Sequence, residues 1–287
     1  MIYYVKRQDL SVEKYDACIE KSINSRIYAF SWYLDIVADN WDALILNDYE
    51  AVMPLPWRSK YFIKYVYPPA WTQQLGIFSS KEISEDLVGN FIKTIPKKFK
   101  KITIQFNSGN KIIGKNITEK VNYVLPLDRP YEELFMNFRN NRKRVLNKAI
   151  GLGYIVDKEI KENEFLELLV NTNKNYILNQ NQKYTLKNLL NIKNESIQIW
   201  GIRKNKKLST CLLLLKNEKR IAYLLPIATM DAKKNGLPTI LIAEILQQYA
   251  NTKLLIDFEG SMIKGVADFY KSFGAEKERY FLFEMPF

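Results

Sequence analysis

Histidine is absent from this sequence of 287 residues, and cysteine occurs only twice, at Cys18 and Cys211. Without histidine, proton transfer would fall to a carboxylate, a tyrosine, a lysine or bound water. Two cysteines and no histidine exclude a thiolate-rich zinc site, so we expect no metal. Cys211 lies in an apolar stretch, where a buried, unreactive thiol is expected rather than a nucleophile.

Long apolar runs are also missing. The longest, such as 211–215 and 240–243, fall far short of the roughly 20 residues that cross a bilayer as a helix. The first 14 residues lack the apolar core and small-residue cleavage site of a signal peptide. These features predict a cytoplasmic protein without a membrane span.

Positive charge is in excess, with 43 Lys and Arg against 31 Asp and Glu, a net charge of +12. The excess points to a partner that carries phosphates, such as nucleic acid, coenzyme A or a nucleotide sugar. The alternative is a general enrichment of lysine that reflects an AT-rich genome. Only local clusters can separate the two, and one such cluster is FRNNRKRVLNKA at 138–149, which contains no acid.

The hydrophobic pattern alternates between helical and strand periods along the whole chain. In the first half it predicts helices at Val12–Lys21, 31–38 (after a serine cap) and 84–95 (capped by Ser84), and strands at 43–46, 51–55 and 101–105. After a strand at 121–127, it predicts helices at 131–150, 162–172, 185–191, 237–249 and 264–272, and strands at 154–156, 197–203, 208–216, 221–228, 253–258 and 279–285.

This order is typical of an α+β fold in which a mixed sheet carries helices on both faces. The first half is a shortened version of the second, so we expect two similar lobes, at 1–126 and 127–287. Pro226 interrupts the apolar run IAYLLPIA, and a central strand accommodates proline only at a β-bulge. A simple end of the strand is the alternative there.

Several motifs together resemble a known family. They are the basic segment at 138–149, DAKKNGLPTIL at 231–241, Asp-Phe-Glu-Gly at 257–260, Gly-x-Ala-x-Phe-x-x-x-Phe-Gly at 265–274 and PPAWTQQLGIF at 68–78. The set resembles the GNAT acyltransferase superfamily and, more narrowly, the two-lobed Fem-type N-acyltransferases, best known as peptidoglycan-bridge aminoacyltransferases. The resemblance implies two tandem GNAT-like lobes, with the acyl donor on the second lobe and an amine acceptor, a small molecule or a peptide, between them.

The resemblance implies acyl-CoA as the donor, with its pyrophosphate on backbone N–H groups at the start of a helix. Lys233, Lys234 and Gly236 occupy the places of the superfamily's Arg-x-x-Gly-x-Gly loop. Pro238 departs from that pattern and removes one N–H, and an ordinary loop with proline in the first helical turn is the alternative. The predicted donor-binding residues are Pro226, Ile227, Lys233, Lys234, Asn235, Gly236, Leu237 and Thr239.

The predicted catalytic residues are Asp257, Glu259 and Tyr270. The two acids are two residues apart, so on a strand they would face the same side, and either could accept a proton from an amine. Tyr270 falls where many GNAT enzymes have a tyrosine that protonates a thiolate, whereas Fem-type members usually have lysine. A phenol of pKa about 10 can protonate a thiolate of pKa about 8.5, which favours a thioester donor over aminoacyl-tRNA. Packing is the alternative role for Tyr270.

The predicted substrate-binding residues come from both lobes: Arg139, Arg142, Lys143, Trp71, Gln73 and Gln74. The basic residues would face phosphates of a nucleotide-linked substrate or of tRNA, or they would form a solvated helix face. The other three would line a cleft or lie in a buried connector. The stretch 153–198 is too short for the long helical hairpin of some Fem enzymes, which makes tRNA the less favoured partner.

Two further functions stay open on the sequence alone. One is an aminoacyl-tRNA-dependent transferase that makes cell-wall precursors. The other is a non-catalytic binding module that kept the fold, which the departures in the phosphate loop favour.

Overall fold

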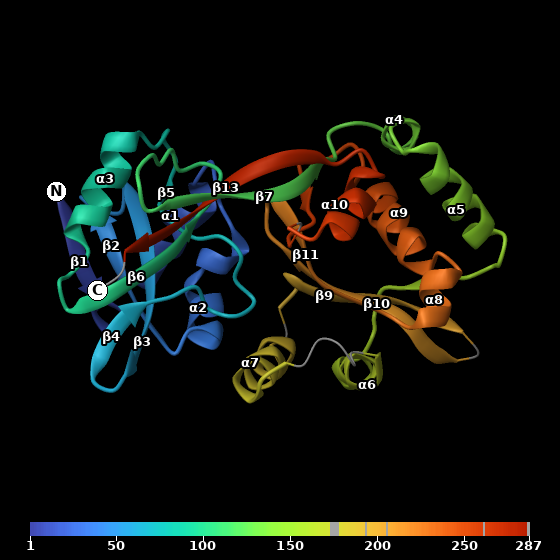
Figure 1. Cartoon of the computed structure of the whole chain (residues 1–287), viewed down its shortest axis with the longest axis horizontal. Coiled ribbons are helices and arrows are strands. Elements are labelled where there is room, and N and C mark those ends of the chain that lie inside the picture. The colour runs from blue at the N-terminus through green and yellow to red at the C-terminus, as the bar shows by residue number, and fades with distance from the viewer. Residues whose placement is uncertain (173–177, 193, 205, 261, 286–287) are drawn as a thin grey trace. The chain divides into compact units, whose positions relative to one another are not determined.

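A computed structural model describes residues 1–172, 178–192, 194–204, 206–260 and 262–285. The chain forms two compact units, which Figure 1 shows. The first comprises Met1–Val121, Tyr184–Leu189 and Glu278–Phe287, and the second Asn122–Lys183 and Leu190–Lys277. Each unit is therefore built from more than one stretch of the chain. Within the described ranges, no helix is both long and apolar enough to cross a bilayer.

The first unit contains a mixed sheet in the spatial order β1-β2-β3-β4-β6-β13. Its neighbours are antiparallel except β4 and β6, which are parallel, and β5 pairs with β3. The strands are β1 (Ile2–Lys6), β2 (Asn40–Leu46), β3 (Ala51–Lys60), β4 (Ile63–Val66), β5 (Phe78–Ser79), β6 (Phe99–Phe106) and β13 (Glu276–Met285). The helices are η1 (Arg7–Asp9), α1 (Val12–Lys21), η2 (Ile27–Ala29), α2 (Ser31–Val37) and α3 (Glu85–Thr94).

Helix capping in this unit follows the sequence at one of two predicted sites. The Ser84 hydroxyl accepts from the backbone N–H of Leu87 at 3.2 Å, which confirms it as the cap of α3. The serine cap expected for α2 is wrong, because Phe30 holds the cap position. The Ser31 N–H and hydroxyl instead donate to the Asp16 carboxylate, which ties α2 to α1.

The second unit contains a mixed sheet in the order β7-β12-β11-β10-β9-β8, in which only β11 and β12 are parallel. The strands are β7 (Ile117–Pro126), β8 (Val156–Asp157), β9 (Ile197–Lys204), β10 (Lys207–Lys216), β11 (Arg220–Ala228) and β12 (Leu255–Asp257). The helices are α4 (Tyr131–Met136), α5 (Asn140–Ile150), α6 (Glu162–Thr172), α8 (Met230–Lys234), α9 (Leu237–Tyr249) and α10 (Lys264–Lys271). Helix α7 (Gln180–Leu190) is divided between the units, since Tyr184–Leu189 belongs to the first.

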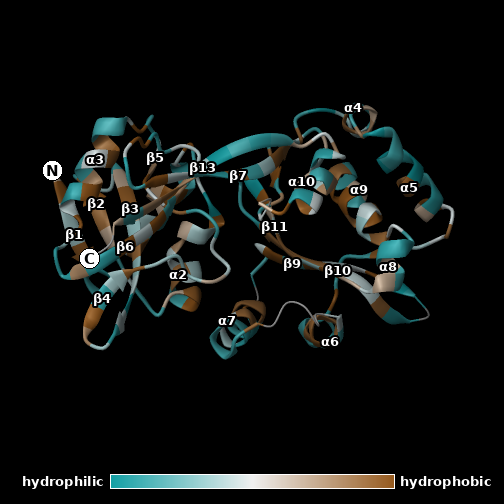
Figure 2. Ribbon diagram, viewed as in Figure 1, coloured by the Kyte–Doolittle hydropathy of each residue, from teal (hydrophilic) through white to brown (hydrophobic). Residues whose placement is uncertain are grey.

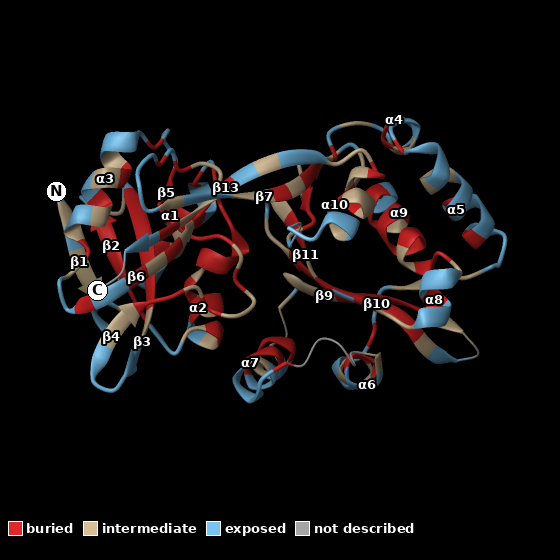
Figure 3. Ribbon diagram, viewed as in Figure 1, coloured by how far each residue is buried: buried red, intermediate tan, exposed pale blue. Residues whose placement is uncertain are grey.

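Helices cover both faces of this second sheet, as the sequence predicts. Helix α9 packs on one face of β9 and β10 with α5 outside it, and α6 covers the opposite face (Figure 1). The sheet and the inner helix faces are buried in Figure 3, and the same segments are mainly hydrophobic in Figure 2. Burial of this apolar surface is the main source of stability.

The single helix predicted over 131–150 is wrong, because the chain breaks it into α4 and α5. Arg139 has φ −61° and ψ 148°, and its N–H donates to the Ser272 carbonyl at 2.9 Å instead of to the preceding turn. Phe138 is buried with its ring 5.1 Å from that of Phe273. Tertiary packing on α10 therefore overrides the helical pattern at this point.

Candidate active site

Strands β11 and β12 part in the middle of the second sheet. Their pairing ends at Ala222 and Asp257, where β12 stops, while β11 continues to Ala228. In the described ranges, the edge of β11 beyond Ala222 has no strand partner opposite β10. Its free backbone groups can therefore pair with an extended ligand. We call this opening the fork.

A β-bulge accompanies the fork. Opposite β10, the pairing jumps from Leu225 to Tyr223, which leaves Leu224 as the extra residue. The bulge predicted from Pro226 is therefore confirmed, although it falls two residues earlier. Pro226 itself is exposed and lies opposite Leu212, while the neighbouring Ile227 is buried.

Aromatic rings fill the base of the fork. The ring of Tyr270, on α10, stacks on that of Phe258 with centroids 4.6 Å apart and an angle of 18°, and it meets the edge of the Tyr223 ring at 5.7 Å. Tyr270 is 5% exposed. Burial, and then the nearby Glu259 charge, raise the pKa of Tyr270 above its usual range. The phenol therefore keeps its proton at neutral pH and cannot act as a base there.

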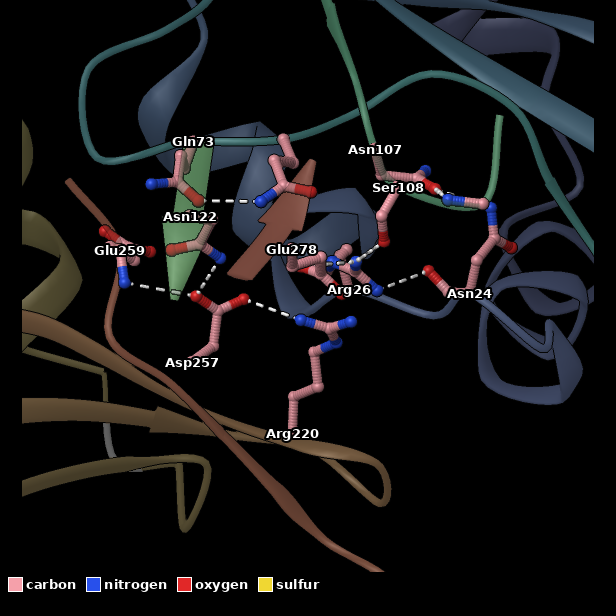
Figure 4. A network of polar contacts seen from close by, with 12 residues as sticks. Asn24, Arg26, Gln73, Asn107, Ser108, Asn122, Arg220, Asp257, Glu259 and Glu278 are labelled. Atoms are coloured by element: carbon pink, nitrogen blue, oxygen red, sulfur yellow. Dashed lines mark hydrogen bonds and ion pairs between the residues drawn. The ribbon is translucent and has the colours of Figure 1, made fainter. Parts of the chain in front are cut away.

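Asp257 is held by three donors at the end of β12, as Figure 4 shows. Its Oδ1 accepts from Asn122 Nδ2 at 2.6 Å and from the Glu259 backbone N–H at 3.1 Å, and its Oδ2 accepts from Arg220 Nη1 at 2.8 Å. The Asp257 side chain is 2% exposed. A buried carboxylate with three donors bound to its two oxygens fits a structural anchor, because most of its acceptor capacity is already used.

The sequence analysis missed Asn122 and Arg220, the side chains that bind Asp257. The one available signal was Asp257 itself, since an acid at the end of a buried strand requires a positive or hydrogen-bonding partner. Nothing in the sequence indicated which residues supply it.

Glu259 lies beside this anchor but outside the strand. Because β12 ends at Asp257 and Glu259 has φ +49°, the argument that the two acids share one face of a strand is wrong. The left-handed conformation is costly for a residue other than glycine. Burial raises the pKa of Glu259 well above its ordinary value. A carboxylate of raised pKa is a stronger base, so Glu259 fits a proton-accepting role better than Asp257 does.

The turn between α8 and α9 contains few free backbone donors. The N–H groups of Lys233, Asn235, Gly236 and Thr239 donate to carbonyls of the same turn, and Pro238 has none. Gly236 has φ +74°, and a Cβ there would lie 2.6 Å from Val145 Cγ1 of α5. Leu237 is buried under the same helix, which leaves the exposed side chains of Lys233 and Lys234 as the available cationic groups.

Some basic side chains of helix α5 are partly buried and others are exposed to solvent. Arg142 donates to Ser272 Oγ at 2.8 Å and to Thr239 Oγ1 at 2.7 Å, and its guanidinium lies 4.4 Å from the Phe269 ring centroid. Burial lowers its pKa. Arg142 therefore joins α5, α9 and α10. Lys143 donates to the Met136 carbonyl at 2.8 Å, while Arg139 is exposed at the cap of α5.

The Phe-Gly pair that follows α10 closes the fold. Gly274 has φ +87°, and a Cβ there would lie 3.1 Å from the Asn137 Cβ, in the break between α4 and α5. Phe273 packs on Phe138 in the same place. Position 274 thus requires glycine for both its conformation and its space.

The first-unit residues predicted to bind substrate lie in a mostly buried connector. Gln74 is 1% exposed, and its Nε2 donates to Gln73 Oε1 at 2.8 Å. Gln73 also lines a small hollow with Tyr67 and Leu75, and the Trp71 carbonyl accepts from the Tyr33 hydroxyl. The structure does not bring Trp71, Gln73 or Gln74 together with the fork residues within one unit.

The first unit has a buried polar network of its own, which the sequence analysis did not predict. The Arg26 guanidinium donates to the carbonyls of Asn24 and Ser25 and to Ser108 Oγ, and it lies 3.7 Å from the Glu278 carboxylate (Figure 4). Arg26 is 2% exposed. These contacts join η2, the end of β6 and β13, so the network stabilises this unit.

Comparisons with solved structures agree with this architecture. The structure of FemX aligns with a TM-score of 0.65 and 11% identity, over 95% of this chain and 96% of that one. A tandem GNAT protein from the clavulanic acid biosynthesis pathway aligns with a TM-score of 0.55 and 9% identity, over 99% and 98%. This is a Fem-type fold of two GNAT-like lobes.

A third solved structure aligns at a similar level. The C-terminal domain of a putative lysylphosphatidylglycerol synthetase from Agrobacterium fabrum aligns with a TM-score of 0.57 and 11% identity, over 95% of this chain and 91% of that domain. No family model and no curated protein matches the sequence. At such identities the matches establish the Fem-type fold and leave the substrate open.

Proposed function

We propose that the protein is an N-acyltransferase that moves an acyl group from a thioester donor to an amine, in a small molecule or a peptide. The observation that carries the proposal is the fork between β11 and β12, with Tyr270 and Glu259 at its base. The solved structures of this fold include a tandem GNAT protein, which supports acyl transfer.

The roles follow from the chemistry of each side chain. The donor extends along the free edge of β11, and backbone N–H groups near Ile227 stabilise the oxyanion. The amine nitrogen attacks the acyl carbon while Glu259 accepts its proton, directly or through water. The C–S bond then breaks, and Tyr270 donates its proton to the departing thiolate. Asp257 positions the loop that carries Glu259.

In this proposal, lysine side chains bind the donor's phosphates in place of backbone N–H groups. Because the turn before α9 has its N–H groups occupied, a pyrophosphate there would be bound by Lys233 and Lys234. Lysine offers a point charge without fixed geometry, so this contact is weaker than a backbone cradle.

The scarcity of backbone donors favours a second candidate, an aminoacyl-tRNA-dependent transferase. A Fem-type fold and exposed cations on α5, including Arg139 and Arg144, agree with it. It differs from the first in two measurable ways, because ribonuclease would abolish the activity and tRNA binding would weaken steeply with salt.

Ligand binding gives the first test of the thioester donor. Acetyl-CoA or a longer acyl-CoA at about 100 times its dissociation constant should stabilise the protein by about 2.7 kcal/mol, measured by thermal unfolding. In Lys233→Gln/Lys234→Gln the shift with acyl-CoA should fall, whereas the shift with acyl-pantetheine, which lacks the nucleotide, should stay. If no thioester shifts the melting temperature, the donor is not a thioester.

Tyr270→Phe tests the proton donor. The substitution keeps the stacked ring and removes only the hydroxyl, so we expect turnover to fall at least about tenfold with little change in melting temperature. Tyr131→Phe, in the same unit but away from the fork, should turn over like the wild type. Equal turnover of Tyr270→Phe and wild type would assign Tyr270 to packing.

A further inference from the structure

The turn between β3 and β4 exposes two aromatic rings at a costly backbone conformation. Tyr61 and Phe62 form a two-residue turn with φ of 48° and 64°, and they are 83% and 103% exposed. Turns with two left-handed residues strongly prefer Asn-Gly or similar pairs. Neither ring contributes to the core of the unit. The conformational cost and the exposed apolar surface therefore call for a partner outside this chain.

Lysines surround the base of this hairpin. Lys60 and Lys64 lie on its two strands, and the parallel pairing of Lys64 with Phe99 places the run KKFKK at 97–101 beside β4. Burial lowers the pKa of Lys98, and the charges of Lys64 and Lys6 lower it further against the opposing effect of Asp42. Lys98, Lys64 and Lys6 therefore lie close enough to repel one another, and the surface around them has a positive electrostatic potential.

The acids near the hairpin are already bound, and they cancel only part of this charge. Asp42 is buried, accepts from the Tyr4 hydroxyl and lies 3.9 Å from Lys98 Nζ. Asp39 pairs with Arg58 at 3.3 Å. The exposed cations of the hairpin and of the 97–101 run other than Lys98 therefore remain available to an anionic partner.

We propose that the β3–β4 hairpin docks the protein peripherally on an anionic phospholipid bilayer. Aromatic side chains such as those of Tyr61 and Phe62 partition into the headgroup region, where the ring is buried and a phenol stays hydrated. The neighbouring lysines are attracted by the surface potential of anionic lipids. A single projecting turn offers far less than the roughly 800 Å² per partner of a stable protein interface, which disfavours a second copy as the occupant. The proposal is independent of acyl transfer.

The test is co-sedimentation of the full chain with vesicles of phosphatidylcholine alone or mixed with phosphatidylglycerol. The wild type should bind the anionic vesicles at least about tenfold more tightly, and salt should weaken the binding. Tyr61→Asn/Phe62→Gly introduces the Asn-Gly pair that this type of turn prefers, so the melting temperature should stay the same or rise. Vesicle binding by this variant should fall at least about tenfold. Ile155→Ser, which alters an apolar side chain 83% exposed elsewhere, should bind like the wild type.

Three results with the wild type and the Tyr61→Asn/Phe62→Gly variant would overturn the proposal. They are equal binding of Tyr61→Asn/Phe62→Gly and wild type, no preference of the wild type for anionic vesicles, and a dimer in solution that the hairpin variant dissociates. Lys60→Gln/Lys64→Gln should lose the preference for anionic lipid, and an unchanged preference would likewise contradict the proposal.

Discussion

Replacing Glu259 by glutamine is expected to lower turnover by about 100-fold or more, since positioned proton transfer contributes roughly 10²–10⁴-fold. The amide keeps the shape of the side chain but cannot accept the proton of the attacking amine. Because burial raises the pKa of Glu259, wild-type turnover should increase with pH over a range above that of an ordinary glutamate. In Glu259→Gln this increase of turnover with pH should disappear.

Stability measurements separate this catalytic role from a structural one. A raised pKa means that the native state binds the proton more tightly than the unfolded chain does. Wild-type stability therefore falls as pH rises from the unfolded value, about 4.3, to the raised native pKa. Glu259→Gln should match the wild type at low pH and gain on it near neutrality. Full turnover by this variant would place the base elsewhere.

Replacing Arg220 by leucine is expected to lower the free energy of unfolding by about 3–5 kcal/mol, measured by urea denaturation. The variant leaves the Asp257 carboxylate, 2% exposed, without its ion-pair partner, and an uncompensated buried charge costs about that much. The loop that carries Glu259 starts at Asp257, so turnover should fall as well.

Lys111→Leu is the matched control, because its pair with Glu82 lies on the surface, with the two side chains 62% and 76% exposed. Removing a surface pair should cost about 1 kcal/mol or less. The double variant Arg220→Leu/Asp257→Asn should recover part of the lost stability, because it removes the unpaired buried carboxylate. A cost below about 1 kcal/mol for Arg220→Leu alone would show that the Asp257 site is more hydrated than its burial indicates.

The periodicity of the hydrophobic residues predicted most of the second sheet and its covering helices. Helices α6 and α9, for example, begin and end at the predicted residues. It did not predict the break at 137–139, because the residues there have helical neighbours in sequence and the cause lies on α10. Short edge elements such as β1 and α8 were also missed. Their formation depends on pairing and packing with distant segments, which local pattern does not encode.

The site was predictable where one residue's own chemistry decides its place. Pro226 indicated a bulge in β11, although the proline itself lies opposite Leu212 and the extra residue is Leu224. The role of Tyr270, which comes from its motif, stays a prediction. By contrast, Arg142 resembles its exposed neighbours in sequence, and only the fold shows that it donates to Ser272 and Thr239. The free edge of β11 likewise depends on where β12 stops.

The place of β13 bears on the order in which the protein folds during synthesis. Phe281–Met285 pairs with β6 of the first unit, and Phe283 is buried in that unit's core, 6.2 Å from the Phe106 ring. Domains usually fold as they leave the ribosome, the N-terminal one first. Here the first unit lacks a strand of its sheet until β13 has emerged, and β13 follows the residues of the second unit in sequence. The second unit can therefore complete its own core before the first one does.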